Sequence, residues 1–204
     1  MTAADVRSSR PTGDRRTQRT RAALVEAFRS QVLDVGYDAI TPTGLAAGAN
    51  VGRSTFYEHF SNVDDVLALS ISRLLTPIVA STLRPEADLE MTETLQHIWD
   101  NRRLGRAMLS GGARVVFARI LAQMFEAGLA ARAADLGATR PHSPPQLAAA
   151  YMAAGVLAVL DVWLAGRAPG SAAQIAQTLH AAGHASAVAL GIPKESPSAW
   201  AGIS

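Results

Sequence analysis

The spacing of hydrophobic residues along the chain predicts α-helices and shows no alternating strand pattern. The first apolar stripe consists of Leu24, Ala27, Phe28 and Val32. These positions are three or four residues apart, the spacing that lines one face of a helix. We therefore expect a helix from about Thr17 that ends at Gly36, because glycine commonly follows the last helical turn.

Two short helices joined by a tight turn are expected next. Thr41 followed by Pro42 has the form of an N-cap with proline at the first helical position, which predicts a helix through about Ala49. Residues 50–52 read Asn-Val-Gly, and both Asn and Gly tolerate the backbone conformations of a turn. A second short helix then covers residues 53–60.

The remainder of the chain is also helical in pattern. Asn62 with Asp65 three residues later resembles a capping box and predicts a longer helix to about Ala80. Further helices are expected over residues 89–101, 103–109, 113–135, 146–166 and from the N-cap Ser171 to about 190. Gly111 and Gly112 separate two of them. The sequence therefore predicts an all-α fold of about nine helices.

Composition narrows the class of protein. The chain has 204 residues, of which 49% are hydrophobic and 18% charged, so a packed core is expected. The absence of cysteine excludes disulfides, thiolate metal sites and cysteine nucleophiles. The most apolar run, residues 147–160, is shorter than the roughly 20 residues that span a bilayer, and the first residues lack the apolar stretch of a secretory signal. We expect a cytoplasmic protein without a membrane partner.

Positive charge is concentrated at the N-terminus. The arginines there are Arg7, Arg10, Arg15, Arg16, Arg19 and Arg21. Six arginines against Asp5 and Asp14 give residues 1–21 a net charge of +4, whereas the whole chain carries +2. Such a segment is either an arm that binds a polyanion or a solvated disordered tail.

The second short helix has one apolar face and one polar face. Phe56 and Phe60 are four residues apart and form the apolar side. The polar surface comprises Arg53, Ser54, Thr55, Tyr57 and His59. An arginine in the first turn of such a helix can donate two hydrogen bonds to guanine O6 and N7 in the major groove. This arrangement is typical of a helix-turn-helix, although an ordinary helical hairpin with a polar outer face has the same pattern.

The local sequence favours the first alternative. Residues 45–60, Leu-Ala-Ala-Gly-Ala-Asn-Val-Gly-Arg-Ser-Thr-Phe-Tyr-Glu-His-Phe, resemble the DNA-binding signature of the TetR family of bacterial repressors, I-A-x-x-A-G-V-S-x-G-T-F-Y-x-H-F. The match covers roughly residues 17–67. Residues 163–166, followed by Pro169 and Ser171, also resemble the junction between the last two helices of many members. The resemblance implies a three-helix DNA-binding domain followed by a larger domain for ligand binding and dimerisation.

The resemblance also implies domain bounds and DNA contacts. It divides the folded part of the chain into a helix-turn-helix domain (15–62) and a ligand-binding and dimerisation domain (63–190). The sequence pattern itself predicts a disordered basic arm (1–14) and a flexible tail (191–204). The residues that match family DNA contacts are Thr43, Arg53, Ser54, Thr55, Tyr57 and His59. Two positions depart from the family: Val63 stands where a phosphate-binding lysine is frequent, and Glu58 adds a carboxylate. The arginine-rich arm can compensate for both.

The expected partners are double-stranded DNA with a near-palindromic operator, a small apolar effector, and a second copy bound through the last two helices. Small residues suited to close packing there are Ala148, Ala149, Ala153, Ala154, Gly155, Ala172, Ala173 and Ala176; they equally suit packing within one subunit. Candidate effector contacts are Trp99, Met108, Phe117, Met124, Phe125, Tyr151 and Met152, each of which can also be plain core.

Other polar residues leave their roles open. Asp161 interrupts an apolar run and either orients a ligand, pairs across an interface or faces solvent. His180 and His184 are four residues apart, but no third metal ligand accompanies them, so we expect neither a metal nor a cofactor. No recognisable catalytic motif is present. The sequence thus predicts a ligand-responsive repressor, with a helical adaptor or an enzyme lacking such a motif as alternatives.

Overall fold

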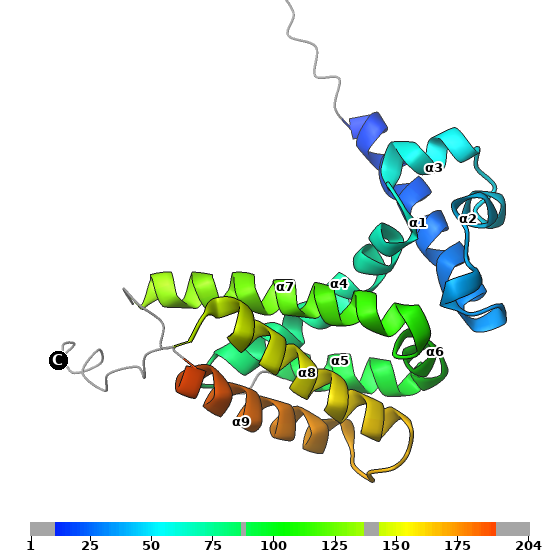
Figure 1. The fold of residues 1–204 in the computed structure, drawn as a ribbon. Helices are drawn as coiled ribbons and strands as arrows, with labels where there is room; N and C mark the ends of the chain where they lie inside the picture. The colour runs from blue at the N-terminus through cyan, green and yellow to red at the C-terminus, as the bar shows by residue number, and fades with distance from the viewer. Residues whose placement is uncertain (1–10, 87–88, 137–142, 191–204) are drawn as a thin grey trace, which may run out of the picture. The chain divides into compact units, whose positions relative to one another are not determined.

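The computed structural model describes residues 11–86, 89–136 and 143–190 (Figure 1). Within these ranges the regular structure is entirely helical, so the all-α prediction is confirmed. The helices are α1 (Pro11–Asp34), α2 (Pro42–Gly48), α3 (Arg53–His59), α4 (Val63–Leu83), α5 (Leu89–Asp100), α6 (Arg102–Met108), α7 (Gly111–Asp135), α8 (Pro145–Leu164) and α9 (Ala172–Leu190), with a 3-10 turn η1 (Tyr37–Ala39). The chain forms two compact units, Met1–Ser70 and Ile71–Ser204, which divide within α4.

Helix α1 begins earlier than the sequence pattern predicts. Its first residue is Pro11, whereas we expected a disordered segment to residue 14 and a helix from about Thr17. Proline is well suited to the first helical position, because the N–H that it lacks has no partner there in any case. Residues 11–14 are therefore helical, a correction to the predicted arm. Residues 1–10 and the predicted tail 191–204 lie outside the described residues.

The N-terminal unit is held together by α1. Leu24, Phe28 and Val32 are buried, as the apolar stripe predicts, and the Phe28 ring meets the edge of Tyr37. The Gln31 amide donates a hydrogen bond to the Gly44 carbonyl at 2.9 Å, which ties α1 to α2. These contacts fix α2 against α1 and so support the helices that follow.

The C-terminal unit is a helical bundle in which α8 packs between α7 and α9, while α5 packs on α9 (Figure 1). Trp163 of α8 is its largest fully buried side chain and stacks on Trp99 of α5, with ring centroids 4.9 Å apart. The Trp163 indole donates a hydrogen bond to the Gly170 carbonyl at 2.9 Å. Trp163 therefore joins α5, α8 and the loop before α9.

One glycine allows two helices of this unit to meet closely. A Cβ atom added to Gly183 of α9 would lie 2.7 Å from the Thr82 methyl group of α4, which is closer than real Cβ contacts. Thr82 is fully buried, and its hydroxyl donates to the Ile78 and Val79 carbonyls of its own helix. Because the hydroxyl is satisfied within α4, Thr82 presents its methyl group to Gly183.

Several helix boundaries follow the predicted caps, and one does not. The Thr41 hydroxyl accepts a hydrogen bond from the Gly44 N–H, and the Ser171 hydroxyl accepts one from the Gln174 N–H, as N-caps do. Gly111 and Gly112, which we expected to separate two helices, instead form the first turn of α7. The break falls one residue earlier, at Ser110, where the backbone is extended.

Two helices of the described chain, α4 and α8, are long and apolar enough to span a membrane by length and composition alone. The expectation that the chain has no membrane span considers only the uninterrupted apolar run in α8, which ends at Asp161. The mean hydropathy of the whole helix stays high even though it includes this charge. About half of each apolar stretch, 56% in α4 and 50% in α8, is buried inside the fold. Such burial is typical of core helices in proteins without a membrane span.

Candidate nucleic-acid interface and effector cavity

The turn between α2 and α3 is closed by backbone hydrogen bonds. The Val51 N–H donates to the Ala46 carbonyl at 2.9 Å, and Asn50 has a positive φ of 55°. Asn adopts this left-handed conformation more readily than most residues, which explains its place in the turn. Gly52 then forms the N-cap of α3. The helix-turn-helix predicted from the sequence is therefore present as a local structure.

An aromatic anchor fixes α3 within the N-terminal unit. Phe56 and Phe60 are 0% and 5% exposed, and their ring centroids are 5.9 Å apart. Leu45 of α2 is also fully buried. The i, i+4 spacing of the two phenylalanines places them on one side of α3, so the other residues of the helix are left on its outer side.

The outer side of α3 presents hydrogen-bonding groups. Arg53, Ser54 and Tyr57 are exposed, whereas Thr55 and His59 are half-buried. The Arg53 guanidinium lies over the Tyr57 ring, 5.7 Å from its centroid, and Tyr57 meets the Phe56 ring edge-on. Because Phe56 is buried, this chain of contacts connects the exposed arginine to the core and restricts its conformations.

Three further positions belong to the DNA-binding surface predicted from the sequence or to its departures from the family pattern. Thr43 is exposed on α2, as a DNA contact requires. Glu58 is exposed on α3, and Val63 is half-buried at the first position of α4. Neither departure from the family pattern is therefore hidden in the core, and any positive charge of this surface must come from other residues.

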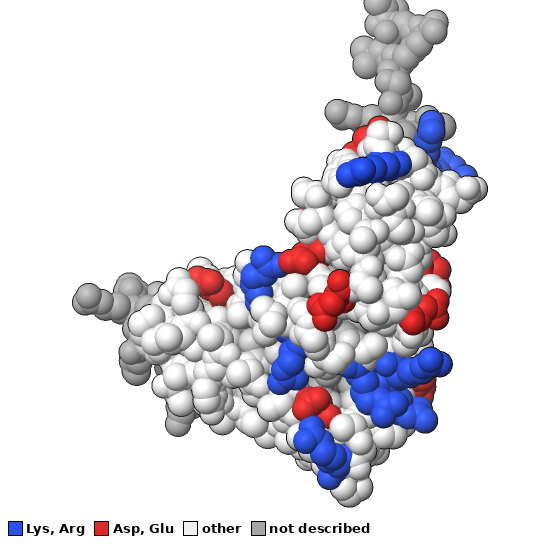
Figure 2. Space-filling view, turned by 45° about the vertical axis from the view of Figure 1, so that its right-hand side comes forward, with Lys and Arg blue, Asp and Glu red and all other residues white. Residues whose placement is uncertain are grey.

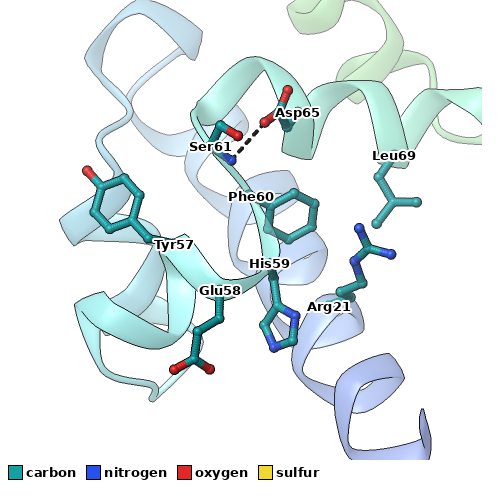
Figure 3. A pocket seen from close by; sticks show the side chains of 8 residues that line it. All are labelled: Arg21, Tyr57, Glu58, His59, Phe60, Ser61, Asp65 and Leu69. Carbon is teal, nitrogen blue, oxygen red and sulfur yellow. Dashed lines mark hydrogen bonds between the residues drawn. The ribbon is translucent and has the colours of Figure 1, made fainter.

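A polar hollow of about 280 Å³ lies beside the C-terminal end of α3 (Figure 3). Its lining consists of Arg21, Tyr57, Glu58, His59, Phe60, Ser61, Asp65 and Leu69. The Arg21 guanidinium lies 5.4 Å from the centroid of the Phe60 ring, and the Ser61 N–H donates to the Asp65 carboxylate at 2.8 Å. The hollow thus brings an arginine of α1 next to the end of α3, a proximity that the sequence pattern alone does not indicate.

More arginines extend along α1. Arg15, Arg16 and Arg19 are exposed, as is Arg21. In Figure 2, cationic side chains of the N-terminal unit gather near the end at which the described chain begins. A cluster of exposed arginines on the unit that carries α3 gives it positive charge that Val63 and Glu58 do not supply.

The C-terminal unit contains a mainly apolar cavity of about 130 Å³. Residues from α4, α7, α8 and α9 line it: Thr82, Phe125, Tyr151, Met152, Gly155, Val156, Val159, Thr178, Leu179, Ala182, Gly183 and Ser186. Only Phe125, Tyr151 and Met152 were among our candidates for effector contacts. The other lining residues are glycine, alanine, hydroxylated residues and the aliphatic Val156, Val159 and Leu179, and such residues carry no ligand-binding signal in a sequence.

The other four candidates for effector contacts lie outside this cavity. Trp99 stacks on Trp163, and Met108 and Phe117 are buried at 6% and 7% exposure. Met124 is half-buried on α7. None of these four residues lines the 130 Å³ cavity, so the structure does not bring the predicted set together at one place.

Helices α8 and α9 leave an uncharged surface exposed, which we call the α8–α9 face. On α8 it comprises Leu147, Ala150, Tyr151, Ala154, Gly155, Ala158 and Val162, and on α9 it comprises Ala173, Gln174, Gln177, Thr178, Ala181, Ala182, Ala185 and Ala189. Of the small residues suggested for an interface, Ala154, Gly155 and Ala173 belong to it. The others, Ala148, Ala149, Ala153, Ala172 and Ala176, are buried within the chain.

The remaining polar candidates have local partners. Asp161 forms an ion pair with Arg167 at 2.7 Å, and both side chains are substantially exposed. The His180 and His184 rings stack, and His180 Nδ1 lies 2.8 Å from the Ser81 carbonyl oxygen. Among the described residues, no group of three or more His, Cys, Asp or Glu is placed to hold a metal ion. His180 thus contacts α4.

Comparison with known proteins places the fold. No family model matches the chain. A stretch of 67 residues is 36% identical to the uncharacterised HTH-type transcriptional regulator YxbF of Bacillus subtilis strain 168; it covers 32% of the chain and 18% of that protein. The chain therefore spans less than a fifth of the relative that it matches.

Solved structures match over most of the chain. NalD of Pseudomonas aeruginosa, the secondary repressor of the MexAB-OprM multidrug efflux pump, is 20% identical with a TM-score of 0.52, over 87% of this chain and all of that one. SmeT, the repressor of the Stenotrophomonas maltophilia efflux pump SmeDEF, is 24% identical with a TM-score of 0.46, over 83% and 90% of the two chains. The relatives are described as regulators of transcription, not as enzymes. The chain has the fold of the TetR-family transcriptional regulators.

Proposed function

We propose that the chain is a transcriptional repressor that binds a near-palindromic operator as a homodimer and leaves it when a small apolar effector binds. The observation that carries the proposal is the outer side of α3, where Arg53 and Tyr57 are exposed and connected to the buried Phe56. A short helix held in this way suits the major groove, where base edges are distinguishable.

Selection of bound fragments from a random duplex pool tests this proposal. A repressor of this kind enriches an inverted repeat whose half-sites are about one helical turn, roughly 34–36 Å, apart. Fluorescence anisotropy with the enriched duplex then gives the affinity at several salt concentrations. A protein that enriches no sequence, and whose DNA binding does not depend on salt, is an adaptor or an enzyme instead.

Arg53→Ala is expected to lose discrimination at one base pair in each half-site and to weaken operator binding by about 1–3 kcal/mol. The reason is that a guanidinium can donate two hydrogen bonds to one guanine. Anisotropy with the enriched duplex and with single-base variants measures the effect. Arg53→Lys is the matched control, because it keeps the charge and loses the paired donors. Equal losses on specific and random DNA would make Arg53 a phosphate contact.

Arg21→Ala is expected to weaken binding to operator and random DNA alike. We assign Arg21 to a phosphate, because it is exposed in the polar hollow next to the end of α3 and Val63 supplies no charge. The plot of log affinity against log salt should become shallower by about 0.9, the value for one phosphate contact. Arg21→Lys should retain the slope. A loss confined to the operator would contradict this role.

Homodimerisation is assigned to the α8–α9 face. Helix α9 contains no Asp, Glu, Lys or Arg, and Asp161, the single charge of α8, is paired with Arg167. Two copies of an uncharged face meet without like charges opposing one another, as a two-fold interface requires. Leu147 and Tyr151, which are 66% and 63% exposed, provide its largest apolar groups.

A regulator of bacterial genes works in the cytoplasm, where the DNA is.

Effector release is assigned to the cavity of the C-terminal unit. A ligand that binds one arrangement of the dimer more tightly shifts the population toward that arrangement. A coupling of about 1–3 kcal/mol would weaken operator binding by roughly 5–150-fold. Helix α4 supplies both Thr82, in the cavity wall, and residues of the N-terminal unit, so it is the element through which we expect the sites to be coupled.

A further inference from the structure

The wall of the 130 Å³ cavity is made of two kinds of residue. Its inner part is buried: Thr82 and Phe125 are 0% exposed, and Met152, Val156 and Leu179 are each 4% exposed. Its outer part consists of the exposed residues Tyr151, Gly155, Thr178 and Ala182. All four outer residues belong to the α8–α9 face. The cavity therefore opens on this face.

Apart from Tyr151, the rim of the opening is formed by small groups. A Cβ atom added to Gly155 would meet no other atom within 4 Å, so the space outside α8 at this position is empty in the single chain. Tyr151, one turn earlier on the same side of α8, is 63% exposed although it lines the cavity. A molecule bound here would therefore keep contact with solvent on one side.

We propose that a second copy of the chain closes this cavity, so that small uncharged molecules bind at the subunit interface and strengthen the dimer. The inference rests on the proposed homodimer through the α8–α9 face. A second copy is the occupant that the face favours, because two copies of an uncharged face meet without like charges opposing one another, and because its small residues permit close approach.

The lining defines the chemistry of the bound molecule. No charged side chain lines the cavity, so a charged ligand would be desolvated without a counter-ion. The hydroxyl groups of Thr82, Thr178 and Ser186 donate to carbonyls of their own helices. The volume is close to that of an engineered apolar cavity of about 150 Å³ that binds benzene. The site thus suits neutral, mainly apolar molecules about as large as benzene.

Ligand binding and dimerisation are thermodynamically linked in this proposal, so each should strengthen the other. A molecule that binds the dimer and not the single chain must stabilise the dimer, and dimerisation must raise its affinity by the same factor. Benzene is a suitable probe because it has no charge and no hydrogen-bonding group. At roughly ten times its dissociation constant it should raise the association constant of the dimer by about tenfold for each site that it fills.

The experiment uses the full chain with ¹³C-labelled methionine methyl groups. Benzene is expected to shift the Met152 methyl resonance in a saturable way and to leave those of Met91 and Met108, which do not line the cavity, in place. Sedimentation equilibrium with and without benzene gives the association constant. If Met152 does not respond, or if the association constant is unchanged, the proposal is wrong.

Two variants separate the cavity from the interface. Ala158→Arg places a charge on the α8–α9 face without altering a lining residue, and it should give a monomer whose Met152 signal no longer responds to benzene. Ala130→Arg, at an exposed position of α7, is the matched control and should retain the dimer and the response.

Val156→Phe fills the cavity from its inner wall and should keep the dimer but lose the response to benzene. Val159→Leu is the milder alternative if circular dichroism shows that Val156→Phe misfolds.

The outcomes distinguish this inference from the proposed function. If the wild-type chain is monomeric, or if Ala158→Arg remains dimeric, the α8–α9 face is not the dimer interface and that part of the proposed function fails. If Ala158→Arg is monomeric and its Met152 methyl group responds to benzene as in the wild type, each subunit holds a complete site. The interface site is then overturned, while the proposed homodimeric repressor stands.

Discussion

Replacing Phe56 with alanine should remove DNA binding by destabilising the N-terminal unit. Phe56 is fully buried and contacts both Phe60 and Tyr57. Substitutions of this kind cost about 3–5 kcal/mol, because they lose apolar burial and leave a cavity. That is a large part of the roughly 5–15 kcal/mol that stabilises a whole domain. Since Arg53 is ordered through Tyr57 and Phe56, its position on α3 should be lost as well.

Hydrogen exchange of the α1 amides measures this loss within the full chain, and anisotropy measures the accompanying loss of operator affinity. Phe56→Leu is the control, since it keeps an apolar side chain at the site and should cost much less. A change below about 1 kcal/mol in Phe56→Ala would mean that α3 does not depend on this anchor. Leu45, which is equally buried on α2, would then be the residue to test.

The second large effect is expected at Trp163. Alanine at this position removes the stacking on Trp99, opens a cavity where the side chain is 1% exposed, and leaves the Gly170 carbonyl without its indole donor. We expect the free energy of unfolding of the C-terminal unit to fall by about 3–5 kcal/mol. Urea denaturation followed by circular dichroism measures it, because this signal does not require the tryptophan.

Trp163→Phe separates the two contributions at this site. It keeps an aromatic ring against Trp99 and loses the hydrogen bond to Gly170, for which a cost of about 1 kcal/mol is typical when the rest of the packing is retained. A Trp163→Phe variant as unstable as Trp163→Ala would show that the hydrogen bond, and not the burial of the ring, dominates. The prediction for Trp163→Ala would then have the wrong physical basis.

Local signals in the sequence predict the helix-turn-helix well. The cap at Thr41, the turn at Asn50 and the spacing of Phe56 and Phe60 depend on residues only a few positions apart. Their geometry is therefore determined by the nearby sequence. The same signals predict which side of α3 is polar. They do not predict the proximity of Arg21 to Phe60, because that contact joins residues of different helices.

Long-range packing explains why the lining of the C-terminal cavity was predicted less well. Thr82 and Gly183 both line it and are in close approach, yet about half of the chain separates them in sequence. Small residues are ambiguous for the same reason. Ala153 is buried and Ala154 is exposed, although they are adjacent and identical, because the rotation of α8 about its axis is set by neighbouring helices.

Methylation interference on the enriched duplex tests the central claim most directly. Methylation of guanine N7 blocks the major-groove position that the outer side of α3 is proposed to contact. For the wild-type chain we predict interference at guanines in two patches about one helical turn apart, and for Arg53→Ala we predict the loss of one such position in each patch. Undiminished binding to duplex methylated throughout both half-sites would show that α3 does not enter the major groove.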